Sequence, residues 1–457
     1  YLRRRTGIAP SRAGASTTRR FFSWKWTWAS LIIIAACAVT FIIQFHFLKQ
    51  PTYYADGSSV PGLNDNALWM CAKRALPTMV FWIVAAILVD RYKPQRFLVW
   101  FFALAWGGCV ATCASLFLNS WAGEQLAVIN DQSGVSSLRT AIFIAPFVEE
   151  ATKGCVIFLI AALDRNRFTS RVSGAVIGIL AGAGFAFTEN IIYYARVVVY
   201  GSMTAGTGDV KAYLDYMVQM RGIYTAFGHP LFTMMTGLGV GFAIASRSKI
   251  VRLLAPAAGF LAAAFLHMFF NFRISLIPQD IFVPVMLIIA WPLVAIVAMR
   301  LVRSSLAQGR TVEARLTDYV AMGWLPSHYP AALSRVRRRL WALMMSPWHG
   351  NLIATWRLQV RATELAMLRE AMTRGVVDQG GLSREYDIVN ELAALAGRKA
   401  VVEGKGLRPY WPWRNWWRRR RQRRGATTPS TRGISSSMAT RSPVRYSAVD
   451  SRWGPPG

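Results

Sequence analysis

Apolar positions along this chain fall into eight long runs separated by short polar segments. Each run is about 17–25 residues long, the length that an α-helix needs to cross the hydrocarbon core of a bilayer. We therefore predict an all-α fold, a polytopic membrane protein with about eight transmembrane helices. The runs cover residues 27–48, 68–89, 97–118, 138–163, 173–200, 221–245, 253–275 and 281–299.

The first run follows a basic segment, residues 1–26, that resembles the n-region of a signal peptide. The apolar stretch behind it is long, and no clear small-residue cleavage site follows. We expect this helix to be retained as an anchor, so that residues 27–299 form one eight-helix domain.

Basic residues are distributed unevenly between the two sides of the predicted bundle. The segments "DRYKPQR", "DRNRFTSR" and "SRSKIVR" would lie on the same side as the N-terminus. The opposite loops carry only Lys49 and Lys211, with Lys73 and Arg74 as a mild exception at the outer end of the second run. The positive-inside rule then predicts a multi-pass protein of the cell membrane with both termini in the cytoplasm.

Composition adds a second region to this picture. Of the 457 residues 54% are hydrophobic, yet the formal net charge is +31, so apolar and basic segments must be segregated. Residues 300–404 have helical periodicity and are predicted to form a basic cytoplasmic region, followed by a disordered tail at 405–457. Its block "RPYWPWRNWWRRRRQRRG" is expected to contact anionic lipid headgroups rather than nucleic acid. A merely solubilising tail remains the alternative.

Four of the predicted spans contain polar residues that are expensive in lipid. A charged side chain at the bilayer centre costs roughly 2.5–3.5 kcal/mol on insertion scales. These residues are Glu149, Glu150 and Lys153 in the fourth span, Glu189 and Asn190 in the fifth, His229 in the sixth, and His267 and Asn271 in the seventh.

The depth of these residues suggests that they share one site. With a helix rise of about 1.5 Å per residue, Glu149, Glu189, His229 and His267 lie roughly 12–17 Å below the outer face. Small residues in "GAVIGILAGAG" and "GLGVGFA" would let the helices approach closely. Independent polar insertions would scatter in depth, so a shared pocket is favoured.

Carboxylates and imidazoles gathered at one depth suit a divalent metal, with zinc as the expected ion. A coordination position left to water would generate hydroxide, and a neighbouring glutamate would act as general base. Lys153 would hold a carboxylate ionised, and Asn190 or Asn271 would stabilise an oxyanion. A metal-free mechanism, in which glutamate and histidine activate water directly, remains open.

Each residue also has a structural explanation. Glu149 and Lys153 could form an intrahelical ion pair, and His229 could be a packing residue at a kink beside Pro230. His267 and Asn271 lie one turn apart and could bridge helices. Glu189 is hardest to explain in this way, because no cation lies near it in its own helix.

The motifs "EEATK", "FAFTEN", "GHPLFT" and "HMFFN", in this order, resemble the signature of the PrsW family of intramembrane metalloproteases. That family is similar to the CAAX prenyl endopeptidases, in which arginine usually replaces Lys153. The resemblance implies a catalytic core at about 135–300 that cleaves membrane-anchored protein substrates, as in site-1 cleavage of an anti-sigma factor. It implies that Glu149, Glu150, His229 and His267 are the catalytic or metal-related positions, supported by Glu189, Lys153, Asn190 and Asn271, and it leaves open which carboxylate is ligand and which is base. We expect Glu150, Glu189, His229 and His267 to bind the metal. The expected catalytic residues are Glu149, Glu150, Lys153, Asn190 and Asn271.

Two other functions remain open from the sequence. A proton- or ion-coupled transporter would also carry glutamates and histidines in its helices, although neither discontinuous helices nor an inverted repeat is evident. A noncatalytic membrane scaffold would retain the fold and act through its cytoplasmic region.

Overall fold

The computed structural model describes residues 25–53, 59–92, 97–130, 138–163, 171–203, 209–246, 248–373 and 379–403. Within these ranges the chain is almost wholly helical, apart from one antiparallel pair of two-residue strands, β1 (Thr52–Tyr53) and β2 (Ser59–Val60). The predicted all-α fold class is therefore confirmed. Predictions for the N-terminal basic segment, the arginine-rich loop at 164–170 and the tail from residue 404 lie outside the described residues.

The chain divides into two compact units. The first, Tyr1–Thr311 with Thr363–Asp387, is called the membrane unit below, and the second, Val312–Ala362 with Ile388–Gly457, the C-terminal unit. The predicted boundary near residue 300 lies inside one long helix, α14 (Trp291–Ala321).

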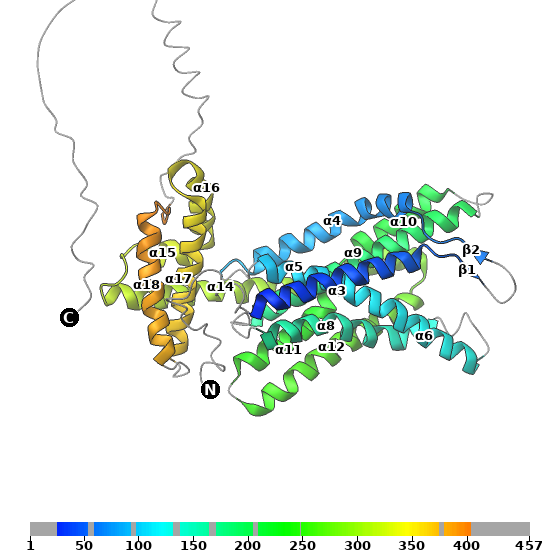
Figure 1. Ribbon diagram of the computed structural model, residues 1–457, viewed down its shortest axis with the longest axis horizontal. Coiled ribbons are helices and arrows are strands. Elements are labelled where there is room, and N and C mark those ends of the chain that lie inside the picture. Colours follow the sequence, from blue (N-terminus) through cyan, green and yellow to red (C-terminus); the bar gives the residue numbers. More distant parts are fainter. Residues whose placement is uncertain are drawn as a thin grey trace, which may run out of the picture. The chain divides into compact units, whose positions relative to one another are not determined.

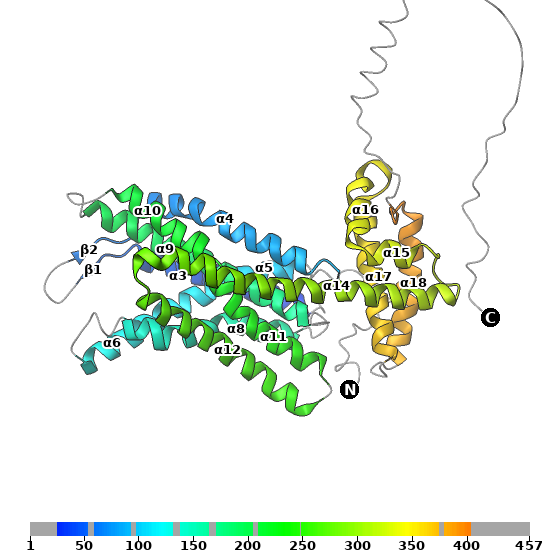
Figure 2. The same ribbon diagram turned by 180° about the vertical axis from the view of Figure 1, so that it is seen from behind.

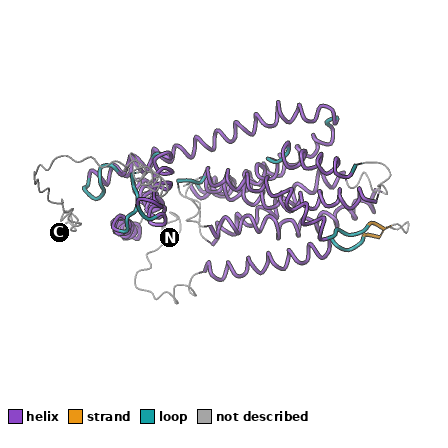
Figure 3. The backbone as a smooth tube through the Cα atoms, turned by 90° about the horizontal axis from the view of Figure 1, so that it is seen from above, coloured by secondary structure: helices purple, strands orange, loops and turns teal. Residues whose placement is uncertain are grey.

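The membrane unit consists of long helices that run side by side, with the strand pair beyond one end (Figures 1 and 3). Its earlier elements are α3 (Lys25–Leu48), α4 (Asp65–Val89), α5 (Phe97–Ala105), η1 (Trp106–Ala111), α6 (Thr112–Asn130), η2 (Thr140–Ile144) and α8 (Ala145–Leu163). The later ones are α9 (Arg171–Met203), α10 (Val210–Gln219), η4 (Met220–Tyr224), α11 (Gly228–Ala245), α12 (Lys249–Leu276), α13 (Gln279–Val285) and η5 (Met286–Ala290), before α14.

Seven of the eight expected spans are long and apolar enough to cross a membrane, judged over the described residues. The protein is therefore a multi-pass membrane protein. The remaining expected span corresponds to η2 and α8, whose apolar sequence is interrupted by Glu149, Glu150 and Lys153. All three are buried, so their charges face the protein interior rather than lipid.

Helix α9 forms the centre of the membrane unit and packs against α11, α4, α5 and η1. Its apolar window is 89% buried, whereas the corresponding value for α4 is 11%. Glycines allow its close contact with α11: a Cβ atom at Gly182 would overlap the carbonyl oxygen of His229, and one at Gly178 would crowd the backbone of Thr233. The predicted close approach of the two glycine-rich segments is thus present, and it fixes His229 against α9.

The sixth predicted span is broken in the structure. α10 and η4 end at Tyr224, a turn covers residues 225–227, and α11 starts at Gly228 with Pro230 in its first turn, where proline is tolerated. The predicted span at 221–245 therefore overlaps a candidate span, Val210–Ile244, that contains a turn. His229 consequently lies at a helix start, as the second residue of α11.

Helix α4 holds this break in place through three side chains spaced four residues apart on one face. Arg74 pairs with Asp215 of α10, the Thr78 hydroxyl donates to the Gly222 carbonyl at 2.8 Å, and Trp82 Nε1 donates to the Ala226 carbonyl at 2.8 Å. The pairing with Asp215 compensates the charge of Arg74, one of the two basic residues that the positive-inside rule did not expect at the outer end of the second span.

The C-terminal unit is built from the end of α14, α15 (Tyr329–Ser334), α16 (Val336–His349), the first half of α17 (Leu352–Thr373) and the second half of α18 (Gln379–Gly397). Helices α17 and α18 lie side by side in both ribbon views (Figures 1 and 2). Its core contains Leu316, Tyr319, Leu333, Met345 and Leu358, all almost completely buried.

Candidate active site

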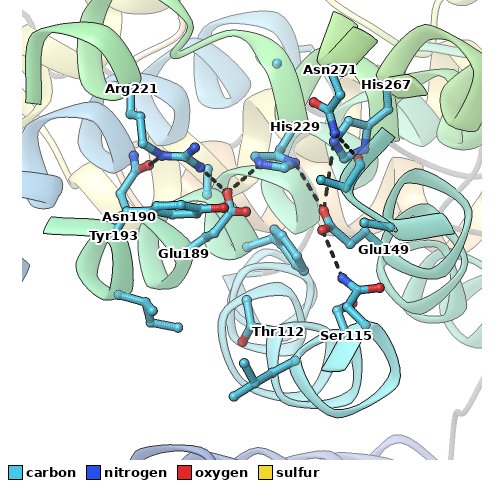
Figure 4. A pocket seen from close by; sticks show the side chains of 18 of the residues that line it. Thr112, Ser115, Glu149, Glu189, Asn190, Tyr193, Arg221, His229, His267 and Asn271 are labelled. Atoms are coloured by element: carbon cyan, nitrogen blue, oxygen red, sulfur yellow. Dashed lines mark hydrogen bonds and ion pairs between the residues drawn. The ribbon is translucent and has the colours of Figure 1, made fainter. Parts of the chain in front are cut away.

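A cavity of about 460 Å³ opens among α6, α8, α9, η4, α11 and α12 of the membrane unit. This volume is typical of a small-molecule or peptide-side-chain site. Six of the predicted site residues line it: Glu149, Glu189, Asn190, His229, His267 and Asn271 (Figure 4).

Two π-helical turns, η2 and η4, contribute residues to the cavity lining, and a third, η1, contacts α9. η2 contributes Ala141, whose carbonyl accepts a hydrogen bond from Asn271 Nδ2 at 2.8 Å. η1 contributes the Gly108 carbonyl, which accepts from the Thr188 hydroxyl at 2.7 Å. η4 carries Arg221. Such turns occur frequently at functional sites because they re-aim side chains out of the regular helical register.

Glu149, His229 and His267 come from three different helices and form the centre of the site. One ligand atom from each lies within 4.8 Å of the others, which is close enough for all three to hold one metal ion. Glu149 Oε2 is 3.9 Å from His229 Nδ1 and 4.0 Å from His267 Nε2. Two imidazoles and one carboxylate form a ligand set used by catalytic zinc sites, and the adjoining cavity leaves room for a further ligand.

The second nitrogen of each imidazole contacts a further carboxylate. His229 Nε2 lies 2.8 Å from Glu189 Oε2, and His267 Nδ1 lies 3.2 Å from Glu150 Oε1. When these nitrogens donate, the opposite nitrogen of each ring becomes the lone-pair acceptor that faces Glu149. A carboxylate behind each ligating histidine is the usual arrangement that orients a metal-binding imidazole.

Glu150 and Lys153 form a closed cluster behind the cavity. Both side chains are completely buried, and neither lines the cavity. Lys153 Nζ donates to Glu150 Oε1 at 2.7 Å and to Glu149 Oε2 at 3.4 Å, and it lies 3.0 Å from His229 Nδ1. Thr233 donates its hydroxyl to Glu150 Oε2 at 2.8 Å. Both oxygens of Glu150 are therefore engaged inside the protein.

Arg221 is a site residue that the sequence analysis missed. Its guanidinium pairs with Glu189, donates through Nε to Asn190 Oδ1 at 2.9 Å, and lies 3.9 Å from the centre of the Tyr193 ring. Figure 4 shows Glu189 between Arg221 and His229. The cation that balances the charge of Glu189 thus comes from another element. In the sequence, the position of Arg221 at the start of an apolar run was the signal that could have identified it.

The two asparagines are both engaged with protein groups. The Asn190 carbonyl accepts from Arg221, while the Asn271 amide donates to the Ala141 carbonyl. Asn119 of α6, which was not predicted, donates to Glu149 Oε1 at 3.4 Å. Nothing in the sequence distinguished Asn119 from other polar residues near a span end.

The structure therefore brings all eight predicted side chains into one connected region, although not in the predicted arrangement. The predicted metal group was Glu150, Glu189, His229 and His267. The group whose atoms can share one ion contains Glu149 and the two histidines, while Glu150 and Glu189 contact the far sides of the imidazoles.

Membrane-spanning helices around a polar cavity with a shared glutamate–histidine group define the class of intramembrane metalloenzymes. Residues 93–297 match the model of the PrsW family intramembrane metalloprotease, and this part of the chain belongs to that family. It is accordingly an intramembrane metalloprotease, a hydrolase of peptide bonds. The comparisons with curated proteins and with solved structures gave no match.

Proposed function

We propose that this protein cleaves a membrane-tethered protein within or next to the outer leaflet, at the glutamate–histidine centre of the cavity. The substrate class that fits best is an anti-sigma-factor-like single-span protein, for which this would be the first cleavage. The proposal rests on the side chains of Glu149, His229 and His267, which converge on one point of the cavity. The cavity lies in the part of the chain that matches the protease family.

The site would be reached from the outer side. The cavity lining includes Gly123 of α6, Thr140 of η2 and Arg196 of α9, all close to loops predicted to be external. With both termini in the cytoplasm, as the distribution of basic residues predicts, the cavity opens toward the outer side of the membrane. A single-span substrate in the same membrane would enter there. The backbone of that substrate would have to leave its helix to be cut, because helical amides have no free hydrogen-bonding capacity.

Glu149, His229 and His267 are the proposed ligands of a divalent ion, expected to be zinc. When bound there, the ion supplies Lewis-acid polarisation of the scissile carbonyl and activation of water. Glu189 and Glu150 orient the two imidazoles, and Lys153 compensates the negative charge of the adjacent glutamates. Arg221 is a positioning residue, since it acts on His229 through Glu189.

A second candidate is direct activation of water by Glu149 without a metal. One contact favours it: Lys153 Nζ lies 3.0 Å from His229 Nδ1, the same atom that would face a metal. In that mechanism Glu149 takes a proton from water while the hydroxide adds to the scissile carbonyl carbon, and it then gives the proton to the leaving amine as the C–N bond breaks. Lys153 compensates the negative charge of the two adjacent glutamates.

Metal analysis together with a cleavage assay tests both candidates. We expect stoichiometric zinc in the purified protein and cleavage of a co-reconstituted single-span reporter, with both lost in His229→Ala and His267→Ala. His46→Ala is the matched control, because His46 is exposed in α3 and its one side-chain hydrogen bond within the described residues is to Gln50. Retained zinc in both site variants would refute the ligand assignment. An absence of cleavage combined with proton-driven solute uptake would favour a transporter instead.

A further inference from the structure

Two successive helices of the C-terminal unit, α16 and α17, expose many large apolar side chains. Met344 of α16 is 57% exposed and Ile353 of α17 is 63% exposed. Leu340, Trp341, Trp348, Leu352 and Trp356 are each at least 39% exposed as well. We call these seven residues the α16–α17 face; both helices are labelled in Figure 2.

The spacing shows that this is the outer face of an amphipathic element. Leu340, Met344 and Trp348 follow one another at intervals of four residues, so they lie along one side of α16. The core side of the same helix is formed by Ala342 and Met345, which are almost completely buried. Contiguous exposed apolar patches of this kind mark protein or membrane interaction sites.

The charged residues of the segment that contains the face are all basic. Between Asp318 and Glu364 the sequence has no acidic residue, although it has six arginines, at positions 335, 337, 338, 339, 357 and 361. Arg338 pairs with Glu403 and Arg361 with Glu391, and Arg339 donates to the Leu333 carbonyl.

The other three arginines, Arg335, Arg337 and Arg357, are exposed and have no ion pair within the described residues. They flank the α16–α17 face in the sequence on both sides. A small cavity of about 120 Å³ also adjoins Ile353, and Arg357, Arg398 and Asn351 line it. Two guanidinium groups and an amide at the edge of an apolar face provide donors for a phosphate oxygen.

We propose that the α16–α17 face docks in the plane of the membrane on anionic phospholipid. Tryptophan and aliphatic side chains would enter the headgroup–acyl boundary, while the arginines and the small cavity bind phosphodiester groups. The face starts only about 40 residues after the last apolar span, in a unit covalently tethered to the bilayer. Tethering gives a high effective concentration, so even weak intrinsic affinity suffices for docking.

Photocrosslinking in the full-length protein tests this proposal. Met344 is replaced by p-benzoylphenylalanine, and the protein is reconstituted in nanodiscs of phosphatidylcholine with or without phosphatidylglycerol. The matched control has the same substitution at Asn390, an exposed position of α18. We expect lipid adducts on the α16 peptide in mass spectra, at position 344 and not at 390, and more of them with the anionic lipid.

Arginine variants measure how much electrostatic attraction contributes to docking on the membrane. Each arginine near an anionic surface contributes about a fivefold change in the docked-to-undocked ratio. Arg337→Gln and Arg357→Gln should each lower the adduct yield, and the double variant should lower it further, with reporter cleavage measured separately. Equal lipid adducts at 344 and 390, or yields insensitive to anionic lipid, would overturn the proposal. So would adducts to protein or nucleic acid in place of lipid.

Discussion

Glu149 and Glu150 are neighbours in α8, yet they belong to two differently built regions of the same site. Glu150 lies in the closed cluster, where Lys153, Thr233 and His267 occupy its oxygens. Glu149 lies at the cavity, where its contacts are longer and its Oε2 faces two imidazoles at 3.9 and 4.0 Å.

The difference follows from what burial in a membrane protein requires. A fully buried charge is tolerated only when it is paired and its hydrogen-bonding capacity is used, as in the closed cluster. A group that performs chemistry must retain unused capacity toward a substrate or ion, which is the condition of Glu149. We infer that the closed cluster holds the fold while the cavity side carries the reaction.

The largest expected effects, on cleavage and on stability, come from replacing Glu149 or Glu150 singly by glutamine. Glu149→Gln should lower reporter cleavage with little change in thermal stability. As the base of the metal-free mechanism its loss costs about 10²–10⁴-fold, and as a metal ligand its loss also lowers the zinc content. Glu150→Gln leaves Lys153 with a weakened partner, and breaking a buried pair costs about 3–5 kcal/mol. Its main effect should therefore be a lower unfolding temperature in detergent, accompanied by a loss of cleavage of about 10–100-fold because Glu150 also orients His267.

Cleavage rates and thermal unfolding of both variants are measured side by side. If Glu149→Gln were the destabilised variant and Glu150→Gln the inactive but stable one, the division between the two regions would be reversed.

An intermediate effect is expected at Arg221, which lies on the cavity side but acts through Glu189. Replacing an outer partner of a metal-site histidine costs about 10–100-fold in activity or metal affinity. Arg221→Met should show such a loss in cleavage and in zinc affinity, and Arg221→Lys a smaller one. Arg196→Met is the control, because Arg196 lines the same cavity and has no hydrogen bond or ion pair in the described part of the chain.

A loss of cleavage in Arg196→Met equal to that in Arg221→Met would mean that positive charge in the cavity matters, rather than the contact with Glu189.

The positions of the spans and of the polar residues within them were predictable because both can be read from the order of apolar and polar residues along the chain. Span length follows from bilayer thickness, and a glutamate or histidine in an apolar run is conspicuous. The division of roles between Glu149 and Glu150 was not predictable in this way. Successive residues differ by about 100° around a helix, so the rotation of α8 decides which one reaches the cavity.

The break before His229 and the role of Arg221 were missed for different reasons. Residues 222–228 are mostly apolar, so the hydropathy pattern continues through the turn, although Gly228 and Pro230 were usable signals. The pairing of Arg221 with Glu189 joins residues 32 positions apart, and only the packing of η4 beside α9 reveals it.

The smallest expected effect isolates one hydrogen bond of the closed cluster. Thr233 and Thr236 are both completely buried in α11, but only Thr233 contacts Glu150, while the Thr236 hydroxyl has no hydrogen-bond partner within the described residues. Thr233→Val should destabilise the protein by about 1.5–3 kcal/mol, the value of a hydrogen bond to a charged group. Thr236→Val should be neutral or slightly stabilising, because it removes a buried polar group without a partner. Equal unfolding temperatures for the two variants would show that the Thr233 hydroxyl does not hold Glu150, and the closed cluster would then depend on Lys153 and His267 alone.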